Sequence, residues 1–127
     1  MTQSQSNHTT PSLLVIQTAG PDSVAAREAL DVVLNAAALD IPVQFVLQGN
    51  AILNLVTPVA LTEAFNTPSV QKKYGMLELF DVPAPMVASE DLQRFGLTAE
   101  QLSIEVTELS QQQLQQQHAH FTQLLRF

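Results

Sequence analysis

One stretch decides the fold: Ser12-Leu13-Leu14-Val15-Ile16-Gln17-Thr18, an apolar run that Ala19-Gly20-Pro21 stops. A short, uninterrupted apolar run that ends in a turn is typical of a strand buried on both faces of a sheet. Helices must then cover both faces of that sheet.

The segment after this strand has the period of an amphipathic helix. Asp22 or Ser23 can cap its start. Its apolar side chains share one helical face: Ala26, Leu30, Val33, Leu34 and Ala37. The apolar strand pattern then returns in residues 43–47, and Gly49-Asn50 turns the chain into a short helical piece, residues 51–56. Strand and helix therefore alternate from the start.

The middle of the chain continues this alternation. Thr67-Pro68 has the form of an N-cap followed by proline at the first helical position, and apolar residues recur at helical spacing up to Phe80. A third strand is expected only at the end of residues 82–88, because its two prolines cannot donate ladder hydrogen bonds. We expect Ser89 to cap a short helix through Phe95.

The last third predicts two more strands. Residues 103–106 are expected to form a fourth strand and residues 121–127 a fifth. Two pairs have the spacing of a capping box: Thr98 with Gln101, and Ser110 with Gln113. Gly96 suits the left-handed position after a helix.

Strands that alternate with helices predict an α/β fold with right-handed crossovers and a parallel sheet between helices. In such folds, functional groups gather at the carboxyl ends of the strands. Here those ends are residues 20–23, 48–50 and 87–91.

The composition of the chain excludes several classes of function. The chain is 46% hydrophobic and only 13% charged, against about a quarter charged in an average domain, so we expect partner subunits to cover some apolar surface. A net charge of −7 repels a phosphate backbone, and direct nucleic-acid binding is not expected. The chain contains no cysteine, which excludes thiol, persulfide and cysteine–metal chemistry of its own.

Residues 1–11 are polar and are expected to be a disordered arm, with residues 12–127 forming one domain. The arm lacks the basic and apolar regions of a secretory signal, and no apolar run approaches the ~20 residues of a membrane helix. The sequence therefore predicts a cytoplasmic protein.

No catalytic, cofactor or metal motif is found. The turn 19–23 lacks the glycines and lysine of a phosphate loop, and capping explains Asp22. His118 and His120 have no evident third ligand, and His8 lies in the arm. The serines stand in no nucleophile elbow. The Gln-rich residues 111–117 are interpreted as a solvated helix with a narrow apolar seam, and a segment that mediates association is the alternative.

Five local sequences, taken in order, resemble one known family: Ala25–Asp31, Gln48–Leu53, Tyr74–Val82, Ala88–Leu97 and Leu124–Phe127. Together they are similar to the TusC/DsrF subunit of the DsrE/DsrF-like sulfur-relay proteins. The resemblance covers nearly everything after residue 11, and the ordered set carries it rather than any single piece.

The resemblance implies a three-layer α/β/α fold around a mostly parallel five-stranded sheet. It also implies assembly with TusB-like and TusD-like partners into a heterohexamer, which passes persulfide sulfur for 2-thiolation of the wobble uridine of tRNA or acts in dissimilatory sulfur metabolism. In the family, the carrier cysteine belongs to the TusD/DsrE-type subunit, just before a short helix. The matching stretch here is Pro85-Met86-Val87-Ala88-Ser89, which has no cysteine. The resemblance therefore implies a non-catalytic accessory subunit.

A second hypothesis comes from another class. The chain is then a stand-alone small-molecule binder, a cysteine-independent enzyme or a homo-oligomer of other role, with Asp22, Asn50, Ser89 and Glu90 converging at the strand ends. The candidate partner-interface or strand-end residues under either hypothesis are Asn50, Tyr74, Phe80, Met86, Val87, Ser89 and Glu90.

Overall fold

The structure is a computed structural model that describes residues 10–21, 23–56 and 69–127. Its centre is a five-stranded sheet in the order β4-β3-β2-β1-β5. Every pairing is parallel, as the sequence predicts. The strands are β1 (Leu13–Gln17), β2 (Val43–Leu47), β3 (Met86–Ala88), β4 (Thr107–Leu109) and β5 (Gln123–Arg126).

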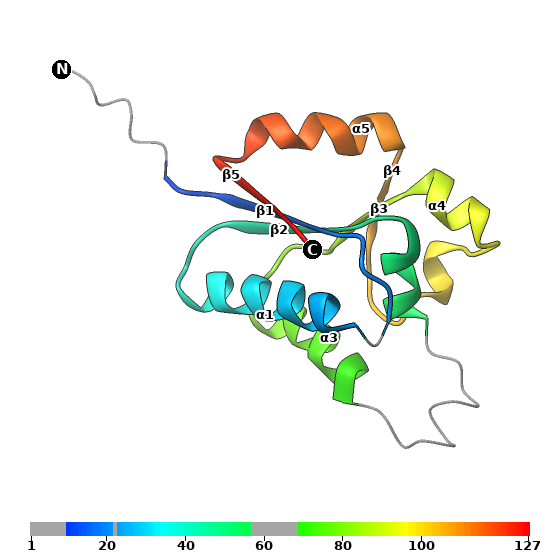
Figure 1. The fold of residues 1–127 in the computed structure, drawn as a ribbon, viewed down its shortest axis with the longest axis horizontal. Helices are drawn as coiled ribbons and strands as arrows, with labels where there is room; N and C mark the ends of the chain where they lie inside the picture. The colour runs from blue at the N-terminus through cyan, green and yellow to red at the C-terminus, as the bar shows by residue number, and fades with distance from the viewer. Residues whose placement is uncertain (1–9, 22, 57–68) are drawn as a thin grey trace.

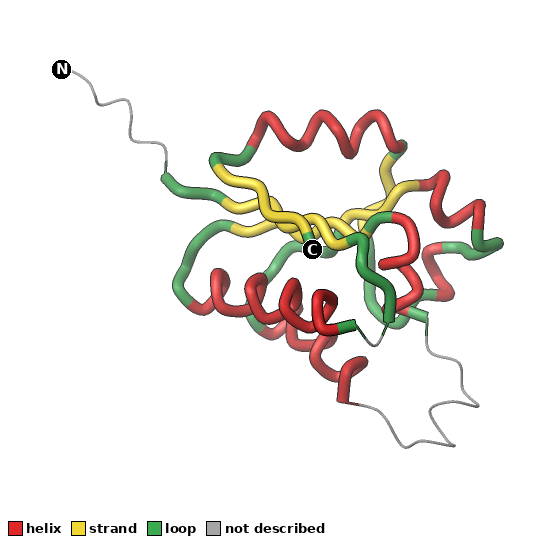
Figure 2. The backbone as a smooth tube through the Cα atoms, viewed as in Figure 1, coloured by secondary structure: helices red, strands yellow, loops and turns green. Residues whose placement is uncertain are grey.

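Helices enclose this sheet from both sides. In Figures 1 and 2, α1 and α3 lie side by side below the sheet, α5 crosses above it, and α4 stands at one end. The α-helices are α1 (Val24–Ala38), α3 (Ser69–Leu79), α4 (Ser89–Arg94) and α5 (Gln111–Gln116). The 3-10 helices are η2 (Gly49–Leu55), η3 (Ala99–Gln101) and η4 (Gln117–His120). The arrangement is the three-layer α/β/α fold that the resemblance implies.

The apolar run that decides the fold is buried on both faces. Val15 joins the larger core cluster under α1 and α3, whereas Leu14 and Ile16 join the smaller cluster under α5. Leu114 is the buried residue of α5 in that smaller cluster. Burying one leucine contributes about 1.5–3 kcal/mol, so α5 is attached to the sheet largely by this side chain.

Helices α1 and α3 end in the same way, with an aspartate where glycine is usual. After α1, Ile41 donates its backbone N–H to the Ala36 carbonyl at 2.9 Å and Asp40 has a φ of 61°. After α3, Val82 donates to the Leu77 carbonyl at 2.9 Å and Asp81 has a φ of 59°. Aspartate tolerates this left-handed conformation better than most residues do.

Several capping predictions are confirmed. The Ser23 hydroxyl accepts a hydrogen bond from Ala26 N at 3.1 Å, and Ser110 forms a capping box with Gln113 at the start of α5. Gly96 has the predicted positive φ, at 67°. Some sequence features lie outside the described residues, namely His8, Asp22, residues 57–66 and Thr67-Pro68.

Two local predictions are wrong. The fourth strand is Thr107–Leu109 rather than residues 103–106. Ile104 and Val106 pack against the core from the connecting segment, and the ladder begins only where Thr107 N donates to the Pro85 carbonyl at 2.8 Å. Ser89 does not cap α4, because β3 runs directly into the helix and Ala88 is the N-cap residue.

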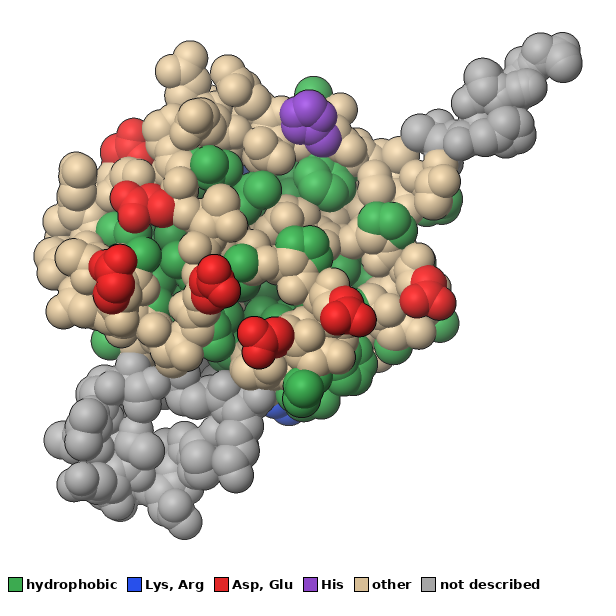
Figure 3. Space-filling model, turned by 180° about the vertical axis from the view of Figure 1, so that it is seen from behind, with side chains coloured by type: hydrophobic (Ala, Val, Ile, Leu, Met, Phe, Trp, Pro, Cys, Tyr) green, Lys and Arg blue, Asp and Glu red, His purple; other side chains and the backbone are tan. Residues whose placement is uncertain are grey.

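The surface carries acidic and apolar side chains together, and few basic ones. Seen from behind (Figure 3), acidic side chains are spread among apolar ones, and basic side chains appear only at the lower margin. The larger exposed apolar residues include Leu39 and Leu79, which are 71% and 79% exposed beside the ends of α1 and α3.

No helix within residues 10–21, 23–56 and 69–127 is long and apolar enough to cross a membrane.

Candidate functional site

The carboxyl ends of the strands meet at one edge of the sheet, and two buried amides support the turn after β1. Gln17 is fully buried, and its Nε2 donates to the Ala19 carbonyl at 2.9 Å. Asn54, in η2, donates from Nδ2 to the same carbonyl at 3.1 Å and to the Ala51 carbonyl at 2.9 Å. The Gln17 and Asn54 side chains therefore fix the backbone of this turn through the Ala19 carbonyl.

A buried tyrosine on α3 reaches one of these two amide side chains. Tyr74 lies on α3, is 1% exposed and forms a side-chain hydrogen bond with Gln17. Burial raises the pKa of the Tyr74 phenol, and the hydrogen bond with Gln17 opposes this only in part. Tyr74 is therefore neutral near pH 7 and is poorly suited to act as a base.

An aspartate joins the loops that follow β2 and β3. Gly49 has a φ of 57° and donates its backbone N–H to Asp91 Oδ2 at 2.9 Å. Asp91 lies in the first turn of α4, where the helix dipole also stabilises a carboxylate. A Cβ at Gly49 would lie 3.7 Å from Arg94 Nη2, which leaves space, so the positive φ is what favours glycine there.

The polar side chains after β3 make structural contacts. The Ser89 hydroxyl donates to the Leu109 carbonyl over 3.4 Å, a long and weak hydrogen bond. Glu90 Oε1 accepts the backbone N–H of Gln111 at 3.0 Å and so supports the start of α5. Ser89 thus connects the end of β3 to the end of β4, and Glu90 connects it to the start of α5.

The edge strand is fixed at the same end of the sheet. The Phe127 carbonyl accepts hydrogen bonds from Thr18 N at 2.7 Å and Ala19 N at 3.3 Å. The Thr18 hydroxyl donates to that carbonyl as well, at 3.1 Å. The turn after β1 is thus held from η2 on one side and from the end of β5 on the other.

The structure brings three of the candidate residues to this edge. Asn50 is exposed at the start of η2, and Ser89 and Glu90 follow the neighbouring strand β3. Asp22, the fourth polar group of the small-molecule hypothesis, lies outside the described residues.

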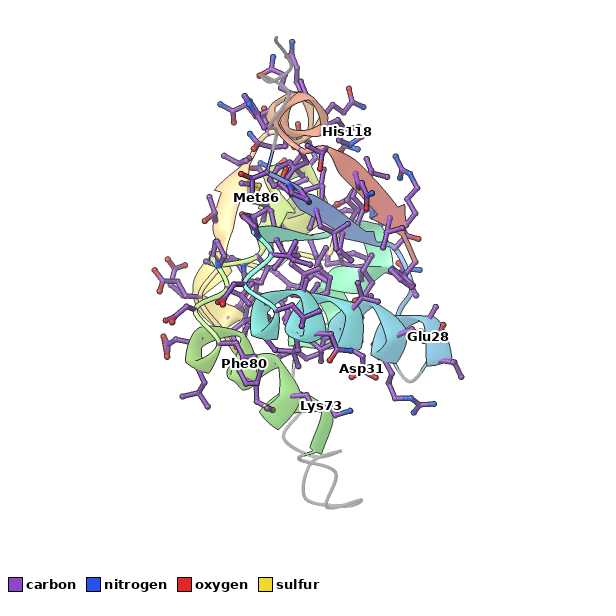
Figure 4. All side chains as sticks on the ribbon, turned by 90° about the vertical axis from the view of Figure 1, so that its left-hand side faces the viewer. Glu28, Asp31, Lys73, Phe80, Met86 and His118 are labelled. Carbon is purple, nitrogen blue, oxygen red and sulfur yellow. The ribbon has the colours of Figure 1, made fainter. Side chains whose placement is uncertain are left out.

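The other four candidates lie elsewhere. Tyr74 and Val87 are buried in the chain's own core. Met86 is half-buried, opens β3 and packs on the smaller core cluster. Phe80 is 36% exposed just past the end of α3, on a different side of the molecule from Met86 (Figure 4).

Sequence reasoning does not single out the residues that organise the edge, which are the buried Gln17, Asn54 and Asp91. Only Asp91 falls within a predicted strand end, residues 87–91. Gln17 was included only as part of an apolar run, and Asn54 as one residue of a short helix. Buried polar side chains need hydrogen-bond partners, but partners as distant in sequence as Gly49 is from Asp91 leave no local signal.

The edge offers little reactive chemistry. The chain has no thiol. Within residues 10–21, 23–56 and 69–127, no group of three or more His, Asp or Glu side chains is arranged to hold a metal ion. Ser89 and Glu90 contact backbone groups, so the edge is better suited to presenting a surface than to attacking a substrate.

Comparisons with known proteins agree with this architecture. The sequence profile of the DsrE/DsrF-like family matches residues 12–127. The fold is similar to the crystal structure of the ychN protein from E. coli, with a TM-score of 0.75 and 13% sequence identity over 92% of this chain and 99% of that one. No curated protein matches the chain by sequence.

Proposed function

The chain belongs to the DsrE/DsrF-like family of sulfur-relay proteins, and from this premise we propose that it is a non-catalytic subunit of a cytoplasmic sulfur-relay complex. Its proposed partners are TusB-like and TusD-like chains. The complex would pass persulfide sulfur toward 2-thiolation of the wobble uridine of tRNA. This chain supplies surface, and a partner supplies the thiol.

The observation that carries the proposal is the absence of cysteine from a member of a family that handles sulfur. A persulfide forms on a thiolate, and neither a thioether nor a hydroxyl replaces it. In the stretch that matches the family's carrier position, Val87 and Ala88 are fully buried, and Ser89 ends the stretch with a hydroxyl. The stretch contains β3 and the first residue of α4, and it lacks the reactive group.

The side-chain contacts at the strand-end edge also support a non-catalytic role for this chain. Its buried amides and Asp91 are used to hold loops, and Glu90 holds the start of α5. These groups position backbone rather than face a substrate. A rigid, unreactive edge of this kind is suited to stand beside a partner's cysteine and limit its exposure to water.

Assembly is tested by co-expression with TusB-like and TusD-like chains encoded in the same genome. Size-exclusion chromatography with mass measurement should give one complex that contains all three chains. A chain that always elutes separately from both would overturn the proposal.

Sulfur transfer is tested on the purified complex with a labelled persulfide donor. Label should appear on the TusD-like chain and not on this one, because only the former has the thiol. The variant Ser89→Cys is the matched control, since it places a thiol at the end of the matching stretch. Label on the natural chain would refute a purely structural role.

A further inference from the structure

Two adjacent hollows lie on the surface near the ends of α1 and α3, away from the strand-end edge. The first has a volume of about 530 Å³ and is bounded by the second half of α3 and by residues 103–105. The second, of about 430 Å³, lies beside the residues that follow α1 and α3. Val82 lines both, so the two hollows are neighbours.

The walls of the hollows contain both apolar and polar groups, and their charged side chains are all acidic. Leu77, Pro85 and Ile104 line the first hollow, together with the carboxylates of Glu78 and Glu105. Pro42, Val43 and Phe80 line the second, together with the carboxylates of Asp40 and Asp81. No lysine or arginine lines either hollow among the described residues.

The basic side chains of the described residues are placed elsewhere. Lys73 forms an ion pair with Asp31, with 3.7 Å between Nζ and Oδ1, between α3 and α1 (Figure 4). Arg94 lies over the Phe95 ring, 4.8 Å from its centre. The four carboxylates of the hollows therefore receive no ion pair within the described part of the chain.

The backbone adds to the negative charge. The carbonyl end of a helix carries a partial negative charge that normally favours cations in the last turn. Neither α1 nor α3 has a basic residue in its last turn, and Asp40 and Asp81 follow the two helices. Two helix ends and four carboxylates thus surround the two hollows with no internal compensation.

We propose that the two hollows form a docking surface for a segment of a partner protein that carries basic side chains next to aliphatic ones. The aliphatic side chains would fill the apolar walls, and the basic groups would meet the carboxylates and helix ends. This inference rests on the proposed function, in which the chain works beside partner chains. It adds where one partner binds and what chemistry that partner must have.

Charge selects this occupant over two others. A second copy of the chain also carries a net charge of −7 and would bring its own carboxylates to the interface. A nucleic acid would bring phosphates to an acidic surface. A basic, partly aliphatic segment is the occupant that gains from both the walls and the charges.

The test uses the full chain and a short acetylated and amidated peptide of alternating leucine, lysine and alanine. Its control peptide has glutamate in place of lysine. Backbone amide shifts in a nitrogen-15 titration should move around the hollows with the lysine peptide and remain unchanged with the glutamate peptide. Shifts scattered evenly over the surface would overturn the proposal.

Two double variants with the same change in charge make the test specific. E78Q/E105Q removes both carboxylates of the first hollow, whereas E100Q/E108Q removes two exposed carboxylates that line neither hollow. The first should weaken peptide binding by about fourfold or more, since each of the two exposed ion pairs is worth a factor of roughly two to five. The second should change it less than about twofold. Equal losses in both, or a loss in neither, would refute the docking surface.

The same variants separate this inference from the proposed function. If the complex with TusB-like and TusD-like chains forms equally well with E78Q/E105Q and with E100Q/E108Q at low ionic strength, where charges are least screened, the docking surface is wrong and the subunit role stands. If no complex forms with the natural chain, the subunit role is wrong whatever the peptide does. A complex weakened only by E78Q/E105Q supports both.

Discussion

Removing a carboxylate from the end of α3 should make the isolated chain more stable. Glu78 lies in the last turn of this helix, next to Asp81, where the helix carbonyls already carry partial negative charge. Glutamine and glutamate have similar helix propensities. The substitution Glu78→Gln therefore removes an unfavourable charge without changing the helix in other respects.

The expected gain follows from the position of the charge. An unfavourable charge at an exposed helix end costs about 0.3–1 kcal/mol at low ionic strength. For a domain of this size such a gain raises the Tm by about 1–4 °C. At ~1 M salt, where charges are screened beyond about 3 Å, most of the gain should disappear.

Glu28→Gln provides the control. Glu28 is an exposed residue in the first half of α1, distant from the helix's carbonyl end (Figure 4), and its loss changes the net charge by the same amount. Thermal unfolding followed by circular dichroism in low and high salt should show a salt-dependent gain only for Glu78→Gln. An equal gain for Glu28→Gln would mean that net charge, not the helix end, is responsible. A loss for Glu78→Gln would refute the electrostatic argument for this surface.

Three further predictions concern the strand-end edge. Asp91→Ala should lower the unfolding free energy by about 1.5–3 kcal/mol in urea denaturation, because the Gly49 N–H loses a charged acceptor. Ser110→Ala should lower the free energy of unfolding by about 1 kcal/mol, because the Ser110 hydroxyl caps α5. Ser89→Ala should lower it by less than about 0.5 kcal/mol, because Ser89 caps no helix. Equal losses would contradict the assignment of Ser110 as the only helix cap of the two. Tyr74 is the only tyrosine, so tyrosinate absorbance should rise only at a pH above 10.0, its ordinary pKa. Because the unfolded phenol ionises first, stability should fall as the pH rises past 10.0, and a Tyr74→Phe variant should lose that fall.

The sequence is most informative where burial is a local property. Residues 43–47 form β2 with the predicted bounds because a mostly apolar run of this length is most stable between two helical layers. The fourth strand was misplaced because Ile104 and Val106 are apolar for another reason, which is packing on the core from a connection. Apolar residues mark burial, but only pairing with β3 decides which residues form the ladder.

The candidate site was less predictable for the same physical reason. Glu90 was found by its position after a strand, yet its role depends on Gln111, which no spacing rule connects to it. Ser89 had the residue type of a cap, and the direct junction between β3 and α4 left that role to Ala88. The acidic hollows combine residues from four separate segments, so their charge pattern becomes visible only after folding.

The strand order has a consequence for synthesis of the chain. Among the five described strands, β1 comes first in the sequence and β5 comes last, yet the two are neighbours in the sheet. Ser12 and Thr122 exchange hydrogen bonds across 110 residues. Until residues 123–126 have been added, β1 is the outermost strand of the sheet, and its apolar side chains stay beside an open edge. Such edges attract other chains. A chain that lacks β5 is therefore expected to aggregate more readily than the chain with β5 in place.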